Sequence, residues 1–418
     1  MPIIRTLEAL EILDSRGRPT LQTTCVLSDG AAATAQVPSG ASTGRAEAHE
    51  LRDGDPSRHG GLGCRKAVGS VKGPIRAALV GTALATQKEL DEALIRLDGT
   101  PNKARLGANA ILAVSLAFAR AEAVSSGTPL YRHFANMSGF NRQQLPRPTI
   151  NLFSGGKHAG GQVAIQDVLI VPIAAKRIDE IMDHACAVFQ SAARLCHRKY
   201  QARTLVADEG GLAPPFPDTT AMLDDALEAI RGAGLEPGRD VALAVDVAAS
   251  HFYEAERYRI DQEELSSLDM IEKISTWLDQ YPIVSVEDGL AETDIEFWPL
   301  LRQRIQDRAL VMGDDLLCTN PDRIRRATTL GWSNALLLKV NQIGTLTEAL
   351  EALRLARNAS WHVTVSARSG ETEDDWLADL AVGWGGDHLK VGSITRSERL
   401  AKYNRLLEIE NILGWPVR

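Results

Sequence analysis

The chain has 418 residues, 44% of them hydrophobic, and it carries 46 basic against 54 acidic residues for a net charge of −8. This length allows a large core and predicts two domains. The negative charge and the lack of a long basic run argue against a nucleic-acid-binding protein or one that binds an anionic membrane surface. The five cysteines show no C-x-x-C spacing, so they indicate neither a zinc site nor a disulfide framework, and we expect buried thiols.

The first 140 residues predict a small α+β unit. The N-terminal segment MPIIRTLEALEILDSRG carries acids and lacks a long apolar stretch, so it resembles neither a signal peptide nor a membrane anchor, and we expect a cytoplasmic protein. Residues 3–37 hold strand-like segments separated by the turn sequences DSRGRP and SDG, which is typical of an antiparallel meander. The small-residue loop VPSGASTGRAE follows, and the nearly all-apolar segment GANAILAVSLAFARAEAVSSG predicts a buried helix.

A linker is predicted at NMSGFNRQQLPRP, which combines Gly, Asn and two prolines. We therefore expect an N-terminal domain over residues 1–138 and a second domain over residues 139–418.

The second domain repeats one pattern: a short apolar run of strand length that ends in a charged residue. The runs are ALAVD, PIVSVED, LVMGDD, ALLLKV, VTVSARS and DHLKVGS, and stretches with helical spacing such as TLTEALEALRLARNA lie between them. Apolar strands that alternate with helices predict a parallel sheet covered by helices, and this many units predict a closed barrel. In such a barrel the carboxyl ends of the strands face the active site, so the charged residues should converge there.

Eight segments in this chain resemble those of the enolase family, in the family's order. They are PSGASTG, ADEGGLAP, AVDVAAS, VSVEDGL, GDDLLCTNP, LLLKVNQIGTLTE, SARSGETED and RSERLAKYN. The resemblance implies a small α+β N-terminal domain followed by a modified eight-stranded α/β barrel with an antiparallel strand near its start. It also implies a homodimer and dehydration of a 2-phosphoglycerate-like acid.

This chemistry explains the acidic residues, because removal of a proton next to a carboxylate builds up charge that divalent cations stabilise. By resemblance, Asp246, Glu287 and Asp314 are ligands of a first Mg²⁺, and Ser42 helps to hold a second. A lone acid at a strand end is more often a helix cap or an ion-pair partner, but three of them within the family's motifs favour metal ligands. Asp288 and Asp315 are expected to play supporting roles.

The resemblance also assigns the remaining site residues. Lys339 matches the catalytic base, and one Mg²⁺ about 5 Å away supplies roughly 6 to 7 kcal/mol, against the roughly 4 to 5 kcal/mol needed to bring a lysine pKa to about 7. Glu209 matches the acid that protonates the leaving hydroxyl, and His158 matches a histidine in a mobile loop. Lys390 matches the lysine at the substrate carboxylate, and Arg368 and Ser369 match ligands of its phosphate.

Five positions depart from the family pattern: Ala367 for a histidine, Asp167 for a glutamate, Ala207 for a glycine, Leu212 for an aromatic residue and Ser154 for an asparagine. Loss of the imidazole at Ala367 is expected to cost roughly 1.5 to 3 kcal/mol. Asp167, beside the candidate acid Glu209, draws its carboxylate back by about 1.5 Å and weakens that partnership.

Three functions remain open. The first, which we favour, is a diverged enolase acting on a 2-phosphoglycerate analogue, such as formation of carboxyphosphonoenolpyruvate in phosphinate antibiotic biosynthesis, for which Ala367 opens room beside Arg368. The second is 2-phosphoglycerate dehydration at a reduced rate. The third is a non-catalytic enolase-like binding or structural protein, which the retained carboxylates and lysines disfavour.

Overall fold

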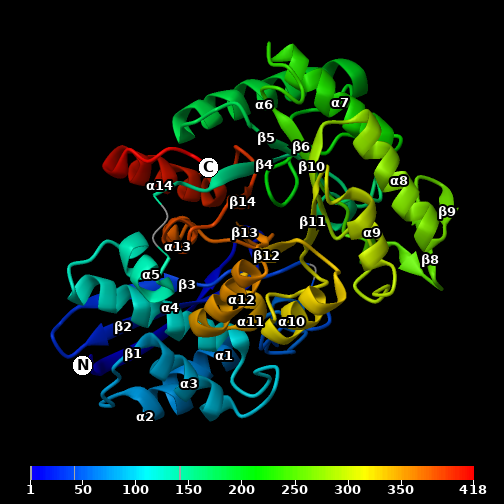
Figure 1. Cartoon of the computed structure of the whole chain (residues 1–418). Coiled ribbons are helices and arrows are strands. Elements are labelled where there is room, and N and C mark those ends of the chain that lie inside the picture. The colour runs from blue at the N-terminus through cyan, green and yellow to red at the C-terminus, as the bar shows by residue number, and fades with distance from the viewer. Residues whose placement is uncertain (1, 42, 141–142) are drawn as a thin grey trace.

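The computed structural model describes residues 2–41, 43–140 and 143–418 (Figure 1). The N-terminal part begins with the predicted antiparallel meander, in which β1 (Ile4–Leu13), β2 (Pro19–Leu27) and β3 (Ala32–Gln36) pair in that order. Helix α4 (Ala108–Ser125) packs on β2 and β3, and 14 of its residues are buried. It is long and apolar enough to cross a membrane, but it occupies the position of a core helix.

The other helical segments of this part surround the meander and α4. They are η1 (His59–Gly61), α1 (Arg65–Ser70), η2 (Val71–Ile75), α2 (Arg76–Leu79), α3 (Gln87–Asp98) and α5 (Leu130–Ser138). The π-type turn η2 contains Pro74, whose missing N–H interrupts the regular α-helical hydrogen bonding between α1 and α2.

The remainder forms the predicted closed barrel, with strand order β10-β11-β12-β13-β14-β4-β5-β6. Its strands are β4 (Arg147–Ser154), β5 (Asp167–Val171), β6 (Ala242–Asp246), β10 (Ile283–Glu287), β11 (Leu310–Gly313), β12 (Ala335–Leu338), β13 (His362–Ser366) and β14 (His388–Gly392). Strand β5 is antiparallel to both of its neighbours, as expected. Its first residue, Asp167, therefore lies at the edge where β6 ends, in register with Asp246.

Helices cover the outside of this barrel. The longer ones are α6 (Ile178–Tyr200), α7 (Thr219–Gly232), α8 (Ser267–Gln280), α9 (Trp298–Ile305), α10 (Pro321–Leu330), α12 (Leu346–Asn358), α13 (Trp376–Gly383) and α14 (Ser397–Leu413). Short turns η3 (Gly156–His158), η4 (Ala249–His251) and α11 (Val340–Ile343) follow strands, and β7 (Tyr253–Glu254), β8 (Arg257–Ile260) and β9 (Glu263–Leu265) form a small separate sheet.

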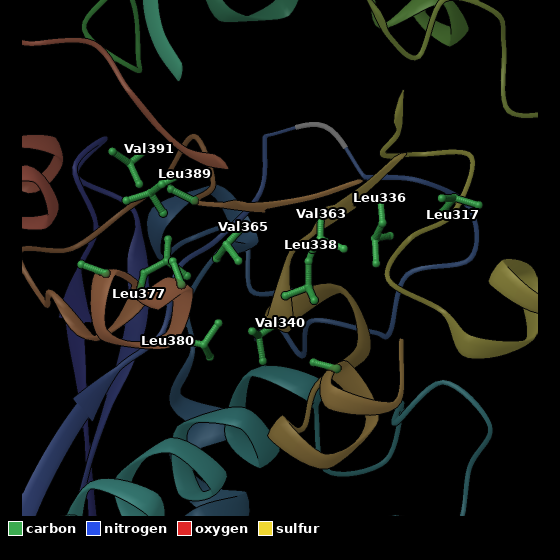
Figure 2. Close-up of a cluster of buried hydrophobic side chains, with 14 of the residues drawn as sticks. Leu317, Leu336, Leu338, Val340, Val363, Val365, Leu377, Leu380, Leu389 and Val391 are labelled. Atoms are coloured by element: carbon green, nitrogen blue, oxygen red, sulfur yellow. The ribbon is translucent and has the colours of Figure 1, made fainter. Parts of the chain in front are cut away.

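Alternation along the strands separates the outer core from the barrel interior. Figure 2 shows Leu336 and Leu338 of β12, Val363 and Val365 of β13, and Leu389 and Val391 of β14 grouped with Leu377 and Leu380 of α13. Because successive strand residues point to opposite faces, the residues between them point into the barrel. Lys390 is one of these, so it lies within β14 and not at the strand end that the sequence pattern indicated.

Two expectations need correction. Four of the cysteines are buried as predicted, but Cys186 on α6 is exposed. The start of the predicted linker, residues 136–138, belongs to helix α5, because the helix continues until Gly139 adopts a left-handed conformation at its end.

Candidate active site

Five charged side chains gather inside the mouth of the barrel, and we call them the strand-end cluster: Asp246, Glu287, Asp314, Lys339 and Lys390. Asp246 and Glu287 end neighbouring strands and are paired in register. Asp314 directly follows β11, and Lys339 directly follows β12. The parallel barrel thus brings together residues that lie far apart in the sequence, as the sequence pattern predicted.

The two lysines form ion pairs with the carboxylates of this cluster. Lys390 Nζ donates to Asp246 Oδ2 at 2.8 Å and to Glu287 Oε2 at 2.7 Å, while Lys339 Nζ donates to Asp314 Oδ2. Burial alone would raise the pKa of Asp246, but the charge and hydrogen bond of Lys390, together with the charges of Lys339 and His158, outweigh burial and lower that pKa to about 2. Burial and the charge of Asp246 together hold the pKa of Glu287 well above its usual range.

The donor set fits a divalent cation. Three carboxylates face two lysine ammonium groups, so the cluster carries an excess negative charge that a cation would offset. Carboxylate oxygens are the ligands that Mg²⁺ prefers. Gln166 Nε2 donates to Asp246 Oδ2 at 3.1 Å and Gln342 Nε2 donates to Asp314 Oδ1 at 2.7 Å, so both carboxylates are held in fixed orientations.

The acidic oxygens are not grouped as the sequence suggested. Within the described ranges, Asp288, Asp314 and Asp315 offer oxygens within 4.8 Å of one another, whereas the Asp246, Glu287 and Asp314 trio does not form such a group. Lys390 lies between the carboxylates of Asp246 and Glu287. Asp288 accepts hydrogen bonds from the backbone N–H groups of Asp314 at 3.0 Å and Asp315 at 2.7 Å, so it holds that turn in place.

A second group, which we call the acid cluster, consists of His158, Asp167 and Glu209. His158 lies between the other two: its Nδ1 is 2.8 Å from Asp167 Oδ2 and its Nε2 is 4.0 Å from Glu209 Oε1. Asp167 therefore acts on Glu209 through His158. Ser154 and Asn151 each donate to Asp167 Oδ1 at 2.7 Å, so Ser154, one of the departures from the family pattern, supports Asp167, another.

Electrostatics place a proton on this cluster at neutral pH. Burial alone would lower the pKa of His158, but the negative charges of Asp167 and Glu209 outweigh burial and raise it to about 9. Burial alone would raise the pKa of Glu209, but the positive charges of His158 and Arg399 lower it below the usual value. The imidazole is therefore the protonated member, and Glu209 is ionised.

The candidate phosphate ligands lie on the loop after β13. The two terminal nitrogens of Arg368 donate to Glu47 Oε2 at 3.0 Å and Oε1 at 3.2 Å. Ser369 Oγ accepts from the backbone N–H of Ala41 at 2.8 Å, and Ser39 pairs with Gly370 through backbone hydrogen bonds. The segment that carries Ser42 is thus anchored beside Ser369, although Ser42 itself lies outside the described residues.

A cavity of about 250 Å³ lies between this segment, the start of α4 and Arg368. It is lined by Glu47 and Asn341, and not by Ala367. Ala367 is 5% exposed, packs in the main hydrophobic core and donates its N–H to the carbonyl of Lys390 at 2.9 Å. Gly44 brings the segment close to the barrel, since a Cβ there would lie 2.5 Å from Cys318 Sγ.

Buried cations from α14 fix the loop that carries Arg368. The guanidinium of Arg399 is fully buried and donates to the carbonyls of Arg368 and Ser369, both at 2.6 Å. Lys402 Nζ donates to the carbonyl of Thr372 at 2.5 Å and pairs with Glu371 at 3.0 Å. Such contacts orient the loop without touching its side-chain donors.

Sequence reasoning missed several of these residues. The sequence did mark two of them: Glu47 follows the glycine-rich loop, and Gln166 precedes Asp167 as a polar residue in an otherwise apolar run. Gln342 and Arg399 lie in helical segments where a polar residue normally faces solvent, so no pattern distinguished them.

Comparisons with known proteins agree with this geometry. Residues 4–134 match the model of the enolase N-terminal domain, and residues 142–417 match that of the enolase C-terminal TIM barrel domain. Enolase 1 of Methylococcus capsulatus (strain ATCC 33009 / NCIMB 11132 / Bath) is 48% identical over 421 residues, which cover 99% of this chain and 98% of that protein. The family normally uses Mg²⁺ and acts on phosphorylated carboxylic acids. The chain therefore belongs to the enolase family and is an enzyme of the hydro-lyase type.

Proposed function

We propose that this enzyme converts 2-phosphoglycerate, or a close analogue, to the enol phosphate and water. The observation that carries the proposal is the placement of Lys339 and of the acid cluster, through Asp167, on opposite sides of the barrel. Lys339 follows β12 and Asp167 begins β5, and these strands are separated by half of the eight-stranded ring. Removal of a proton from carbon 2 and departure of the hydroxyl from carbon 3 need two such groups.

Lys339 would take the proton from carbon 2. Burial alone would lower its pKa, but the negative charges of Asp314 and Glu287 together outweigh burial and raise the pKa above its usual value. When bound, Mg²⁺ would supply positive charge to the carboxylates and to the charge that develops on the substrate. Asp246, Glu287 and Asp314 would hold it once Lys390 leaves the space between the first two carboxylates. Asp314 would then no longer serve Lys339 alone, and the lysine could lose its proton more readily.

The acid cluster would donate a proton to the leaving hydroxyl. His158 carries this proton in the resting enzyme, because its pKa is about 9. Glu209 lies 4.0 Å from it and would pass the proton on to the oxygen at carbon 3. Asp167 would hold the imidazole in the orientation that this transfer needs.

The other end of the pocket would bind the substrate's charged groups. Arg368 and Ser369 would bind the phosphate, since a guanidinium fork matches phosphate geometry. Glu47 occupies that fork now, so the phosphate would have to displace it. Lys390 would move from its carboxylate partners towards the carboxylate of the substrate.

The direct test is turnover of 2-phosphoglycerate, followed by the absorbance of the enol phosphate, with and without Mg²⁺. We expect turnover that a chelator abolishes and Mg²⁺ restores. Turnover that is equally fast in the chelator would contradict the mechanism, and no turnover of this substrate would direct attention to its analogues.

A second candidate rests on Ala367. This position lacks the imidazole expected beside Arg368, but Ala367 packs in the core and does not line the cavity beside Arg368, so this candidate rests on the sequence alone. Its substrate would be a phosphorus-carboxylated analogue, with carboxyphosphonoenolpyruvate as product and a role in phosphinate antibiotic biosynthesis. If so, Ala367→His should shift preference towards 2-phosphoglycerate by about 1.5 to 3 kcal/mol in kcat/KM. An unchanged preference would rule out this candidate. The non-catalytic alternative is set aside, because the chain is an enzyme of this family.

We further propose two Mg²⁺ ions per chain, the second held in part by Ser42, and a cytoplasmic homodimer. We also propose the domain division 1–138 and 139–418, which the end of α5 at Ser138 supports.

A further inference from the structure

The barrel interior below the strand-end cluster is apolar on one side and polar on the other. Strands on the apolar side contribute Leu169, Val171, Ala244, Met312, Ala335 and Leu337. The polar side is formed by β4, β13 and β14, whose outward residues on β13 and β14 pack in the core of Figure 2. Their inward residues include Thr149 and Thr364, which neighbour Lys390 and His388 of β14 in register.

Three buried side-chain oxygens have no hydrogen-bond partner: Thr149 Oγ1 and Thr364 Oγ1 on this polar side, and Glu287 Oε1 at the end of β10, across the barrel from β14. Each of these residues is at most 6% exposed. Because a buried polar atom without a partner costs free energy, three of them in one place require an explanation.

These three residues line one cavity. The cavity has a volume of about 20 Å³, and Lys390 and His388 lie at its border. About 10 to 15 Å³ of such volume holds one water molecule. The cavity therefore has room for one water and little else.

We propose that this cavity is the binding site of one ordered water molecule that joins Thr149, Thr364 and Glu287. The water donates one hydrogen to Glu287 Oε1, and its remaining hydrogen and lone pairs serve the two threonine hydroxyls, each of which can donate or accept. All three orphaned oxygens gain a partner in this way.

A metal ion suits this cavity poorly. The ammonium of Lys390 borders it and repels cations, while the rest of the lining is largely apolar: Leu169, Val171, Ala244, Val245 and Met312. Even with the hydroxyl of Ser285, the lining offers fewer side-chain oxygens than the six or more ligands that Mg²⁺ or Ca²⁺ takes.

The water would act as a positioning element for Glu287. Lys390 holds one oxygen of this carboxylate and the water holds the other, so Glu287 keeps its orientation when Lys390 turns to a substrate. This consequence for Mg²⁺ binding rests on the proposed function, whereas the water itself does not.

A high-resolution crystal structure of the full chain tests the water directly. We expect one density peak within hydrogen-bond distance of all three oxygens, and its absence from the Thr149→Val, Thr364→Val double variant. An empty cavity in the parent, or a peak with the short contacts of a metal ion, would overturn the proposal. The parent structure alone decides this, so the test does not depend on the valine variant folding.

Calorimetry of Mg²⁺ binding, without substrate, tests the positioning role. Because partners of metal ligands contribute about 10- to 100-fold to affinity, we expect the double valine variant to bind Mg²⁺ about 10-fold more weakly. The matched Thr149→Ser, Thr364→Ser variant keeps both hydroxyls and should bind as the parent does. Thr23→Val serves as a control, since Thr23 Oγ1 is also buried and unpartnered but lies on β2.

The outcomes separate the two ideas. If the water is present but the valine variant binds Mg²⁺ like the parent, the positioning role is wrong. If the parent itself binds no Mg²⁺, the proposed function fails. The electron density still shows whether the water is present.

Discussion

The two groups at the mouth of the barrel are built differently. The strand-end cluster lies on or directly after regular parallel strands, whose ladders fix its backbone. The acid cluster takes His158 from the turn η3, Glu209 from a loop and Asp167 from β5, which is antiparallel to its neighbours in the barrel. Side-chain hydrogen bonds join Asp167 to His158, Ser154 and Asn151. A rigid frame suits carboxylates that must keep a fixed spacing for a cation, whereas a hydrogen-bonded network suits a proton that must move. Under the proposed function, the rigid cluster would bind the cation and remove a proton, and the hydrogen-bonded cluster would supply one.

The largest effect is expected at Lys339. Lys339→Met should lower kcat by about 10²- to 10⁴-fold, because that is what a general base contributes. It should also abolish exchange of the carbon-2 proton with heavy water, measured by NMR of the substrate. Lys103→Met is the matched control, since Lys103 is another buried lysine, 2.8 Å from Glu348, that belongs to neither cluster. Exchange at the parent rate would show that the base lies elsewhere.

The acid cluster should respond differently. Glu209→Gln should reduce elimination by about 10²-fold, since a proton for the leaving hydroxyl is lost. Exchange of the carbon-2 proton should continue, because Lys339 is untouched. If both reactions fell together, the two clusters would not be separate in function and the comparison would fail.

Mg²⁺ binding should belong to the strand-end cluster alone. A 100-fold excess of Mg²⁺ over its Kd should stabilise the parent by about 2.7 kcal/mol, measured by chemical unfolding. Glu287→Gln should lose this stabilisation, whereas Glu209→Gln should retain it. Equal stabilisation of both variants by Mg²⁺ would show that Glu287 is not a ligand of the metal ion.

The smallest effect concerns the pH dependence set by Asp167. The pKa of His158 is raised to about 9, so its contribution to stability is complete below about pH 6.5 and is lost as pH rises through about 9. Asp167→Asn should lower the pKa of His158 towards its usual value, as observed by NMR titration. The parent should then lose stability relative to the variant between these pH values. A His158 pKa that stays near 9 would assign the shift to Glu209.

The strand-end cluster could be predicted because each of its members lies in or directly after an apolar run, and a parallel barrel brings such ends together. The sequence predicted Lys390 in the pocket, but at the end of its strand and not within it. A lysine inside an apolar run gives no sign of which face of the strand it occupies. The position of Asp167 between Ser154 and His158 depends on β5 running backwards, which only the resemblance indicated. The clamp by Arg399 was not predictable, because a buried arginine and an exposed one look the same in a helical pattern.

The antiparallel strand β5 has a consequence for the order in which the barrel forms. Strands β4 and β5 are close in sequence and pair directly, so closing the short loop between them costs little entropy, whereas β14 must return across the whole domain to pair with β4. We expect pulse-labelled hydrogen exchange to find amides of the β4–β5 pair protected before those of β14. The last pair of strands to form is then β14–β4, in which Lys390 pairs with Thr149. The barrel and the catalytic pocket are therefore completed in the same step.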